Sequence, residues 1–265
     1  MIESDQLSVL SNLRLNDRQG QLLEQLRRHR TATIAALAKE LDVSTETVRR
    51  DVRWLAAKGL VAKSHGSVAW PDRREDRPLE RRLLVNMPAK QAIAAAVARE
   101  IADGESLLID TASTNIYVAE ALQGHRGLTA ITNSAPIAQR LSQGQGSKVM
   151  LAGGEVRADD SAAFGPSTLA FLDQFQVDTA IISCAAINAE TGVMDNHLCE
   201  AEVCQALVRH AHRVILATDQ TKFSAQGLVV ACKFDDIDLL ITDAPPPAEL
   251  AKRLEAADVE VQIAG

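Results

Sequence analysis

Apolar side chains along residues 17–58 recur every three to four positions, which is the spacing of helices with one buried face. Short polar stretches separate three such segments, so we expect helices over 17–29, 33–41 and 44–58. Asn16 and Ser44 stand where a side chain can cap the first N–H groups of a helix. The second and third helices are joined by a tight turn, which is the organisation of a helix-turn-helix.

The polar face of the third predicted helix carries hydroxyl and guanidinium groups. Hydroxyls near a helix N-terminus can contact phosphates or base edges, and arginine can bind both acceptor atoms of guanine. Residues 60–68 then predict a short β-ribbon, a wing, with its tip at 65–67. A surface helix with solvated arginines is the alternative. The expected DNA-contacting residues are Ser44, Thr45, Thr47, Arg49, Arg50, Arg53, Lys63, His65 and Gly66.

From Pro88 onward short apolar runs alternate with helical patterns. Such alternation predicts an α/β fold with a mostly parallel sheet covered by helices. The expected strands are 107–110, 128–132, 148–152, 179–183, 214–217, 239–242 and 259–263. The expected helices lie near 89–102, 115–123, 135–142, 167–174, 199–210 and 247–256.

The segment between these two patterns mixes proline with dense charge of both signs, which is typical of a linker. We therefore expect a winged helix-turn-helix domain over 1–69, a linker over 70–87 and an effector domain over 88–265.

Polar loops follow four of the predicted strands. Ligands of open α/β sheets bind beyond the carboxyl ends of the strands, where helix N-termini present free N–H groups. Hydroxyls, amides, paired glycines and one lysine at such a place suit a phosphate or another small anion. Each loop alone is also explained by helix capping and turn formation. The candidate residues are Asp110, Ser113, Thr114, Thr132, Asn133, Ser134, Gly153, Gly154, Arg157, Asp219 and Lys222.

Charge is divided unevenly between the two parts. The chain has 28 Lys plus Arg against 35 Asp plus Glu, a net charge of −7. Residues 14–82 carry 16 basic and 10 acidic side chains, whereas residues 83–265 carry 12 and 23. A basic module of this kind suits a polyanionic partner, although a chance cluster of solvated arginines would give the same balance.

Composition excludes several other classes of protein. The longest apolar run is about seven residues, Ala92 to Ala98, far short of the ~20 that span a membrane. The first residues lack the pattern of a signal peptide, so we expect a cytoplasmic protein. The four cysteines are too irregularly spaced for a disulfide framework, and the cysteines and histidines of 197–212 lack the spacing of a metal site. No cofactor is expected.

Residues 37–52, followed by Leu55, Gly59-Leu60 and residues 63–66, resemble the signature of the DeoR family of bacterial transcription regulators. The resemblance continues through 110–114, 132–134, 153–157, Glu200 and 219–223, which match, in order, loops of the family's effector domain. It implies a fold related to ribose-5-phosphate isomerase, in which these loops, Glu200 included, bind a phosphorylated sugar or polyol. Binding of that effector would alter affinity for operator DNA.

Two branches of the family share further features with this chain. Residues 153–157 and 242–247 are similar to the glycerol-3-phosphate repressor branch. Ser183 and Ala186, and the absence of a lysine at Cys204, are similar to the sulfoquinovose-responsive regulators. Departures from the common pattern are Ser67 in the wing and Ala112 in the first effector loop, where the family usually has glycine. The effector is therefore expected to be an anionic sugar derivative, phosphorylated or sulfonated.

An enzyme is the alternative function, because Glu200, Asp219 and Lys222 could serve acid–base chemistry on an aldose phosphate. A helix-turn-helix on the same chain argues for sensing, so we expect no enzymatic activity. The resulting expectation is a repressor of a carbohydrate or polyol catabolic operon. Its partners would be operator DNA, an anionic sugar or polyol phosphate effector and other copies of the chain, as a homodimer or homotetramer.

Overall fold

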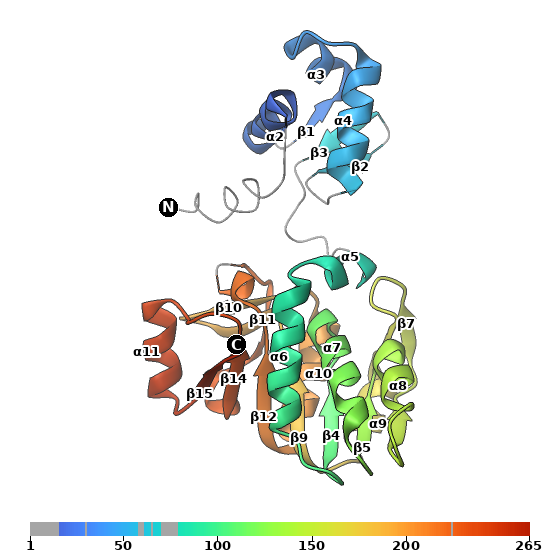
Figure 1. The fold of residues 1–265 in the computed structure, drawn as a ribbon, viewed down its shortest axis with the longest axis vertical. Helices are drawn as coiled ribbons and strands as arrows, with labels where there is room; N and C mark the ends of the chain where they lie inside the picture. Colours follow the sequence, from blue (N-terminus) through green and yellow to red (C-terminus); the bar gives the residue numbers. More distant parts are fainter. Residues whose placement is uncertain (1–15, 30, 58–60, 65, 70–78, 224) are drawn as a thin grey trace. The chain divides into compact units, whose positions relative to one another are not determined.

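The computed structural model describes residues 16–29, 31–57, 61–64, 66–69, 79–223 and 225–265. The chain divides into two compact units, residues 1–75 and 76–265 (Figure 1). His65, at the predicted wing tip, and residues 70–78 of the predicted linker lie outside the described residues.

The first unit packs three helices against a small antiparallel sheet. The helices are α2 (Asp17–His29), α3 (Ile34–Glu40) and α4 (Thr45–Ala57), and the strands are β1 (Thr31–Thr33), β2 (Ala62–Ser64) and β3 (Ser67–Ala69). The sheet has the order β1-β3-β2. Leu22, Leu37 and Leu55, one from each helix, are fully buried in the shared core. The predicted helices and wing are confirmed, whereas β1 is too short to leave a pattern in the sequence.

A seven-stranded parallel sheet forms the centre of the second unit, with the order β15-β14-β12-β9-β4-β5-β6. These strands are the seven that the sequence predicted. All but the edge strands β6 and β15 bury most of both faces, because short apolar runs suit a sheet that helices cover. Their bounds are β4 Ser106–Ile109, β5 Thr129–Thr132, β6 Lys148–Leu151, β9 Val177–Ile182, β12 Ala211–Ala217, β14 Leu239–Thr242 and β15 Glu260–Ile263.

Helices cover the sheet on both faces (Figure 1). One core lies under α6 (Met87–Arg99), α7 (Ser113–Ala121) and α8 (Ala135–Leu141). The other lies under α9 (Pro166–Leu172), α10 (Leu198–Arg209) and α11 (Ala248–Ala256). Alternate residues of one strand enter the two cores, as Leu107 and Leu108 of β4 do.

Short strands that the sequence did not predict lie outside the main sheet. β7 (Glu155–Arg157) pairs with β8 (Ala162–Phe164), and β11 (Gly192–Asp195) pairs with β10 (Ala186–Asn188) and β13 (Val229–Cys232). β7, β10 and β11 mix polar and apolar residues within three or four positions, which leaves neither an apolar run nor a periodic signal. They nevertheless position Arg157 and Asp195 near the polar loops, as described below.

Residues 79–84, within the predicted linker, form the helix α5 (Leu79–Leu84) instead. Leu79 is buried in the core with α6 and α7, and Leu83 packs against the same core. The backbone N–H of Leu79 also donates to the Asp159 carbonyl at 2.9 Å. The two leucines were not recognised in the sequence because they lie among densely charged residues. Because they pack against the core, this end of the predicted linker is part of the second unit. Among the described helices, none has the length and apolarity that crossing a membrane requires.

Candidate functional site

The polar face predicted for DNA contact lies along α4. Val48, Val52 and Leu55 point into the core of the first unit, which leaves Arg49, Arg50 and Arg53 on its exposed side. Ser44 and Thr45 are also exposed, and Thr47 is half-buried. The helical periodicity of 3.6 residues therefore places the three arginines together on one surface.

One of the predicted hydroxyls, that of Ser44, caps the helix. Ser44 Oγ accepts from the Thr47 backbone N–H at 3.1 Å and lies 2.8 Å from Thr47 Oγ1. Glu46 accepts hydrogen bonds from Arg49 at 3.4 Å and from Arg53 at 3.2 Å, in exposed pairs that contribute little to stability. Such weak pairs leave the guanidinium groups available for exchange onto phosphate or base edges.

A buried carboxylate, which the sequence analysis did not single out, fixes α4 against α2. Asp51 accepts from the Arg18 guanidinium at 2.6 Å and from Gln19 Nε2 at 3.3 Å. Asp51 and Gln19 are both buried. Asp51 lies on the same helix as the exposed arginines, but its contacts assign it to holding the fold.

The described part of the wing shows why glycine stands at its tip. Gly66 has φ of +74°, a conformation that side-chain-bearing residues rarely adopt, and it is exposed. Its carbonyl accepts from the Ile34 N–H at 3.3 Å, which ties the tip to the start of α3. Lys63 is opposite Val68 in the β2–β3 ladder.

The polar loops of the second unit follow the carboxyl ends of β4, β5 and β12, and most of their side chains are buried. Asp110, Ser113, Thr132, Asn133 and Asp219 are each at most 9% exposed, as are Thr114 and Ser134.

Two buried polar atoms of the loop after β5 lack partners among the described residues. Asn133 Nδ2 donates to the Ala163 carbonyl at 2.9 Å, and the Ser134 N–H donates to Thr132 Oγ1 at 3.1 Å. Asn133 Oδ1 and Ser134 Oγ have no hydrogen-bond partner within the described structure. Unpaired buried polar atoms of this kind are costly, and a bound ligand can satisfy them.

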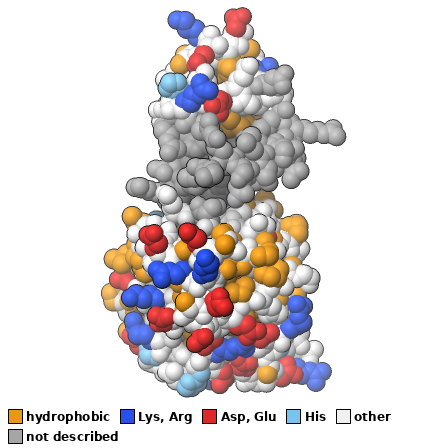
Figure 2. Space-filling model, turned by 90° about the vertical axis from the view of Figure 1, so that its left-hand side faces the viewer, with side chains coloured by type: hydrophobic (Ala, Val, Ile, Leu, Met, Phe, Trp, Pro, Cys, Tyr) orange, Lys and Arg blue, Asp and Glu red, His pale blue; other side chains and the backbone are white. Residues whose placement is uncertain are grey.

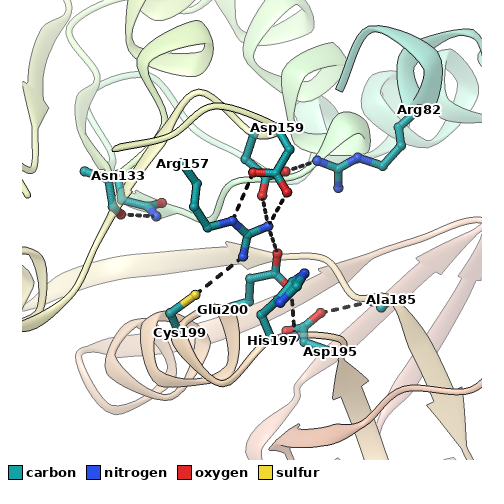
Figure 3. A network of polar contacts seen from close by, with 11 residues as sticks. Arg82, Asn133, Arg157, Asp159, Ala185, Asp195, His197, Cys199 and Glu200 are labelled. Atoms are coloured by element: carbon teal, nitrogen blue, oxygen red, sulfur yellow. Dashed lines mark hydrogen bonds and ion pairs between the residues drawn. The ribbon is translucent and has the colours of Figure 1, made fainter. Parts of the chain in front are cut away.

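Arg157 lies at the centre of an ionic network (Figure 3). Its guanidinium donates to Asp159 at 3.0 Å and to Glu200 at 2.9 Å, and it also pairs with Asp160. It contacts Cys199 Sγ at 3.4 Å. Three carboxylates therefore surround the arginine that the sequence assigned to the effector.

Glu200 is likewise engaged within the protein. Besides Arg157, its carboxylate accepts from the His197 backbone N–H at 3.3 Å, in a capping box at the start of α10. Asp160 is 1% exposed and pairs with Arg82 of α5 as well as with Arg157. The network thus joins β7, α10 and α5.

Ser113, in the first turn of α7, contacts a buried lysine that the sequence analysis missed. Lys90 of α6 is 3% exposed, and its ammonium donates to Ser113 Oγ at 2.9 Å and to the Arg82 carbonyl at 2.5 Å. Burial lowers the pKa of Lys90 to about 8, and the nearby Asp219 carboxylate only partly offsets that effect. Its spacing from Ala94 and Val97, both buried, was the available signal: the three share one helix face.

Asp219 and Lys222 lie beside Lys90, at the turn after β12. Asp219 Oδ1 accepts from Thr221 Oγ1 at 2.6 Å and from Asn86 Nδ2 at 3.0 Å. Burial alone would raise the pKa of Asp219, but the Thr221 hydrogen bond and the charge of Lys222 outweigh it and lower the pKa. The Lys222 ammonium forms no ion pair with the described residues. Lys90 and Lys222 therefore place two ammonium groups around one carboxylate.

Packing explains why glycine stands at the second position of the Gly153-Gly154 pair. A Cβ on Gly154 would lie 2.2 Å from Thr168 Oγ1 and 2.6 Å from the Phe164 carbonyl oxygen. Thr168 Oγ1 in turn donates to the Gly153 carbonyl at 3.0 Å. The glycine pair lets β7 begin close to β8 and α9, and so sets the position of Arg157.

Asp110 is the most perturbed carboxyl group of the site. Burial raises its pKa well above the usual value, and the charges of Asp195 and Glu200 raise it further. Asp195, on β11, was not predicted as a site residue; its carboxylate accepts from the Ala185 N–H at 3.0 Å. A carboxyl with a raised pKa can remain protonated and donate a hydrogen bond. Within the described residues no group of His, Cys, Asp or Glu side chains suits a metal ion.

Each of the two units matches the model of a known protein family. Residues 18–74 match the DeoR-like helix-turn-helix domain, and residues 85–244 match the DeoR C terminal sensor domain. The chain belongs to the DeoR family and is a DNA-binding transcription regulator. The predicted family and fold class are confirmed.

Particular relatives are repressors. The chain is 35% identical to the HTH-type transcriptional repressor CsqR of Escherichia coli K12, over 95% of this chain and 97% of that protein. It is 28% identical to the glycerol-3-phosphate regulon repressor of the same organism, over 95% and 100%. Ribose 5-phosphate isomerase from Plasmodium falciparum is more distant, with a TM-score of 0.37 and 13% identity over 50% of this chain and 51% of that one. That distance is too great to indicate an activity.

Proposed function

We propose that the chain represses a carbohydrate or polyol catabolic operon and that a phosphorylated or sulfonated sugar derivative controls its binding to operator DNA. The observation that carries this proposal is the pair of ammonium groups, Lys90 and Lys222, near the Asp219 carboxylate at the strand ends, with Lys90 donating to Ser113 Oγ. Two cations with one nearby carboxylate favour an anionic ligand over a neutral sugar. The names of the two repressors above are consistent with such a regulator.

On the DNA side, we propose that Arg49, Arg50 and Arg53 contact the operator, with Ser44, Thr45 and Thr47 at the start of the same helix. Support comes from the exposure of the arginines and from the weakness of their pairing with Glu46. The wing residues Lys63, His65 and Gly66 would add contacts to the backbone or the minor groove.

On the effector side, Lys222 and Ser113 would bind the anionic group. The hydroxyl and amide groups of 132–134 would bind the sugar, since two of their buried atoms lack partners in the described structure. Arg157, Glu200 and Asp219 would shape the site through the contacts they make with other protein groups. The sensing part of the chain would begin at α5, before the predicted boundary at residue 88.

A ligand screen tests this proposal directly. The purified chain is heated with glycerol 3-phosphate, glucose 6-phosphate, ribose 5-phosphate and sulfoquinovose, and with the neutral parent of each. A compound at ~100 times its Kd stabilises the folded chain by about 2.7 kcal/mol, which shifts the melting temperature measurably. A compound that binds must then change operator affinity in a gel-shift titration. Failure of every anionic compound to bind would overturn the effector assignment.

We also propose that the chain has no enzymatic activity. An isomerase would need a carboxylate free to move a proton, and Glu200 is committed to Arg157 and to the capping box. Incubating the chain with the same sugar phosphates and following interconversion by NMR tests this directly, because any turnover above that of buffer would contradict it.

Assembly and location remain proposals of the same kind. We propose a cytoplasmic homodimer or homotetramer, since operators usually repeat their half-sites. Large hydrophobic side chains exposed on the second unit include Leu84, Val156, Leu198 and Leu228. Figure 2 shows hydrophobic side chains gathered on one face of this unit, interspersed with charged groups. Light scattering of the full chain tests the assembly, and a monomer at micromolar concentration would exclude it.

A further inference from the structure

We propose that Lys90 contacts the effector and couples the effector site to α5, the helix that begins the described part of the second unit. The inference rests on the proposed function and adds a residue and a route to it. Its basis is that one ammonium group bridges the site and the helix: Lys90 donates to Ser113 Oγ on one side and to the Arg82 carbonyl on the other.

The partners of Lys90 make it suited to accept an anion. Both of its hydrogen-bond acceptors are uncharged, although the side chain is 3% exposed. The charged groups that act on it are Asp219, Lys222 and Arg82, of which only Asp219 is opposite in sign. A buried cation gains most from a partner that brings a full negative charge, and charge-assisted hydrogen bonds are about twice as strong as neutral ones. A phosphate or sulfonate near Ser113 would supply that partner.

Among the described residues, the polar contacts that hold α5 to the rest of the second unit lead to the site or to its neighbours. Arg82 pairs with Asp160, which also pairs with Arg157. The Leu79 N–H donates to the Asp159 carbonyl, and Asp159 binds Arg157 as well. Leu83 offers its carbonyl to the Tyr117 hydroxyl at 2.9 Å, and Tyr117 belongs to α7. The position of α5 is therefore tied to the same side chains that shape the effector site.

A further contact follows α5 directly. Asn86 adopts φ of +51° and donates from Nδ2 to Asp219, the carboxylate between the two lysines. Apart from Leu79 and Leu83, α5 has little apolar surface to bury, since it has six residues and Leu84 is 76% exposed. Weakly packed elements held by polar contacts are those whose stability a ligand can shift most readily.

The proposed exchange is simple. An effector anion takes one of the Lys90 N–H donors from the Arg82 carbonyl, and α5 loses one of its contacts with the site. Binding of the effector and docking of α5 are then coupled, and the coupling is reciprocal by thermodynamic necessity. The first unit precedes α5 in the chain, so a change at α5 is a route toward operator affinity.

The test compares full-length wild type with Lys90→Met, which keeps the length of the side chain and removes its charge. Lys148→Met is the matched control, because Lys148 is exposed at the start of β6, the end of the strand away from the site. The ligand is the screened compound that binds wild type most tightly. Calorimetry gives its Kd, and hydrogen exchange of peptides covering residues 79–86 reports on α5 with and without it. Thermal melting of each variant without ligand verifies its folding.

We expect Lys90→Met to raise the Kd roughly tenfold or more, while Lys148→Met leaves it unchanged. We also expect the compound to speed exchange over 79–86 in wild type and in Lys148→Met, but not in Lys90→Met at saturating ligand. Lys90→Arg, which retains the charge, should recover part of the affinity. An unchanged Kd in Lys90→Met would overturn the contact, and unchanged exchange over 79–86 in wild type would overturn the coupling. If no compound binds wild type, the proposed function fails together with the inference.

Discussion

The two units organise their polar residues in opposite ways. In the first unit, Arg49, Arg50 and Arg53 lie within one exposed helical stretch, and their pairing with Glu46 is weak. In the second unit, the polar side chains come from segments far apart in the sequence, from Lys90 to Lys222, and most are buried and already hydrogen-bonded. A long polyanion can be met by a local row of exposed charges, whereas a small anion needs converging groups removed from water.

The largest expected effect is on operator affinity and comes from the exposed arginines of α4. Replacing both Arg49 and Arg50 by alanine should weaken operator binding by about 2–6 kcal/mol, since each lost base contact costs about 1–3 kcal/mol. Ligand binding in the second unit should not change. Gel-shift titration at fixed salt measures the loss, with Arg28→Ala, an exposed arginine of α2, as control. Full operator affinity in the double variant would show that α4 does not make the main DNA contacts.

Asp51 tests the difference between the two sides of α4, because it lies on the same helix as the arginines but faces inward. Asp51→Ala should destabilise the first unit by about 1–3 kcal/mol, as buried Gln19 loses an acceptor. Chemical denaturation followed by Trp54 fluorescence measures the change, since Trp54 packs against the core of the first unit. Glu46→Ala on the exposed face is the matched control, and equal stability of the two variants would refute the assigned role.

The converging groups of the second unit predict selectivity for charge. A phosphorylated or sulfonated ligand should bind at least about tenfold more tightly than its neutral parent, a difference of about 1.4 kcal/mol. Lys222→Ala and Ser113→Ala should lose the ligand's effect on operator binding while still binding operator, because α4 belongs to the other unit. Calorimetry and gel shifts provide the two measurements. A Lys222→Ala chain with a full response would rule out this anion site.

The smallest expected effect is a dependence on pH. Burial lowers the pKa of Lys90 to about 8, with Asp219 opposing and Lys222 and Arg82 reinforcing the shift. An anion binds the protonated form, so affinity should be full below pH 8 and fall by at most about tenfold per pH unit above it. Sulfonate is fully ionised throughout this range, and a phosphate monoester, whose second pKa is about 6, loses its last proton mainly below pH 7, so neither adds a falling slope. Calorimetry from pH 7 to 8.5, where the loss stays below tenfold, measures the dependence, and Lys90→Arg should flatten it.

Much of the fold was predictable because its signals are local. Apolar runs mark inner strands of the sheet such as β4 and β14, and Leu22, Leu23 and Leu26 mark a helix face without any knowledge of the partner. The short strands β7 and β11 were not predictable, since their mixed polar and apolar residues form a strand only when a neighbour supplies the pairing.

The candidate site was predictable in its loops but not in its contacts. Loops after strands identify themselves by hydroxyls and glycines, as at 110–114. Lys90 lies in an alanine-rich helix, where a lone lysine usually faces solvent, and only its spacing from buried neighbours indicated otherwise. Asp160 gave no signal at all, because its importance comes from two arginines 3 and 78 positions away.

The double pairing of Asp160 also matters to anyone who builds a biosensor from this chain. A fusion that joins a foreign DNA-binding module at residue 88 discards α5, and with it Arg82, Asn86 and the buried side chain of Leu79. Asp160 and Asp219 would each lose a partner, and a strip of core would face water. A junction placed before Leu79 transplants the sensor with its own connecting helix, so the useful modular boundary lies upstream of the place where the sequence pattern changes.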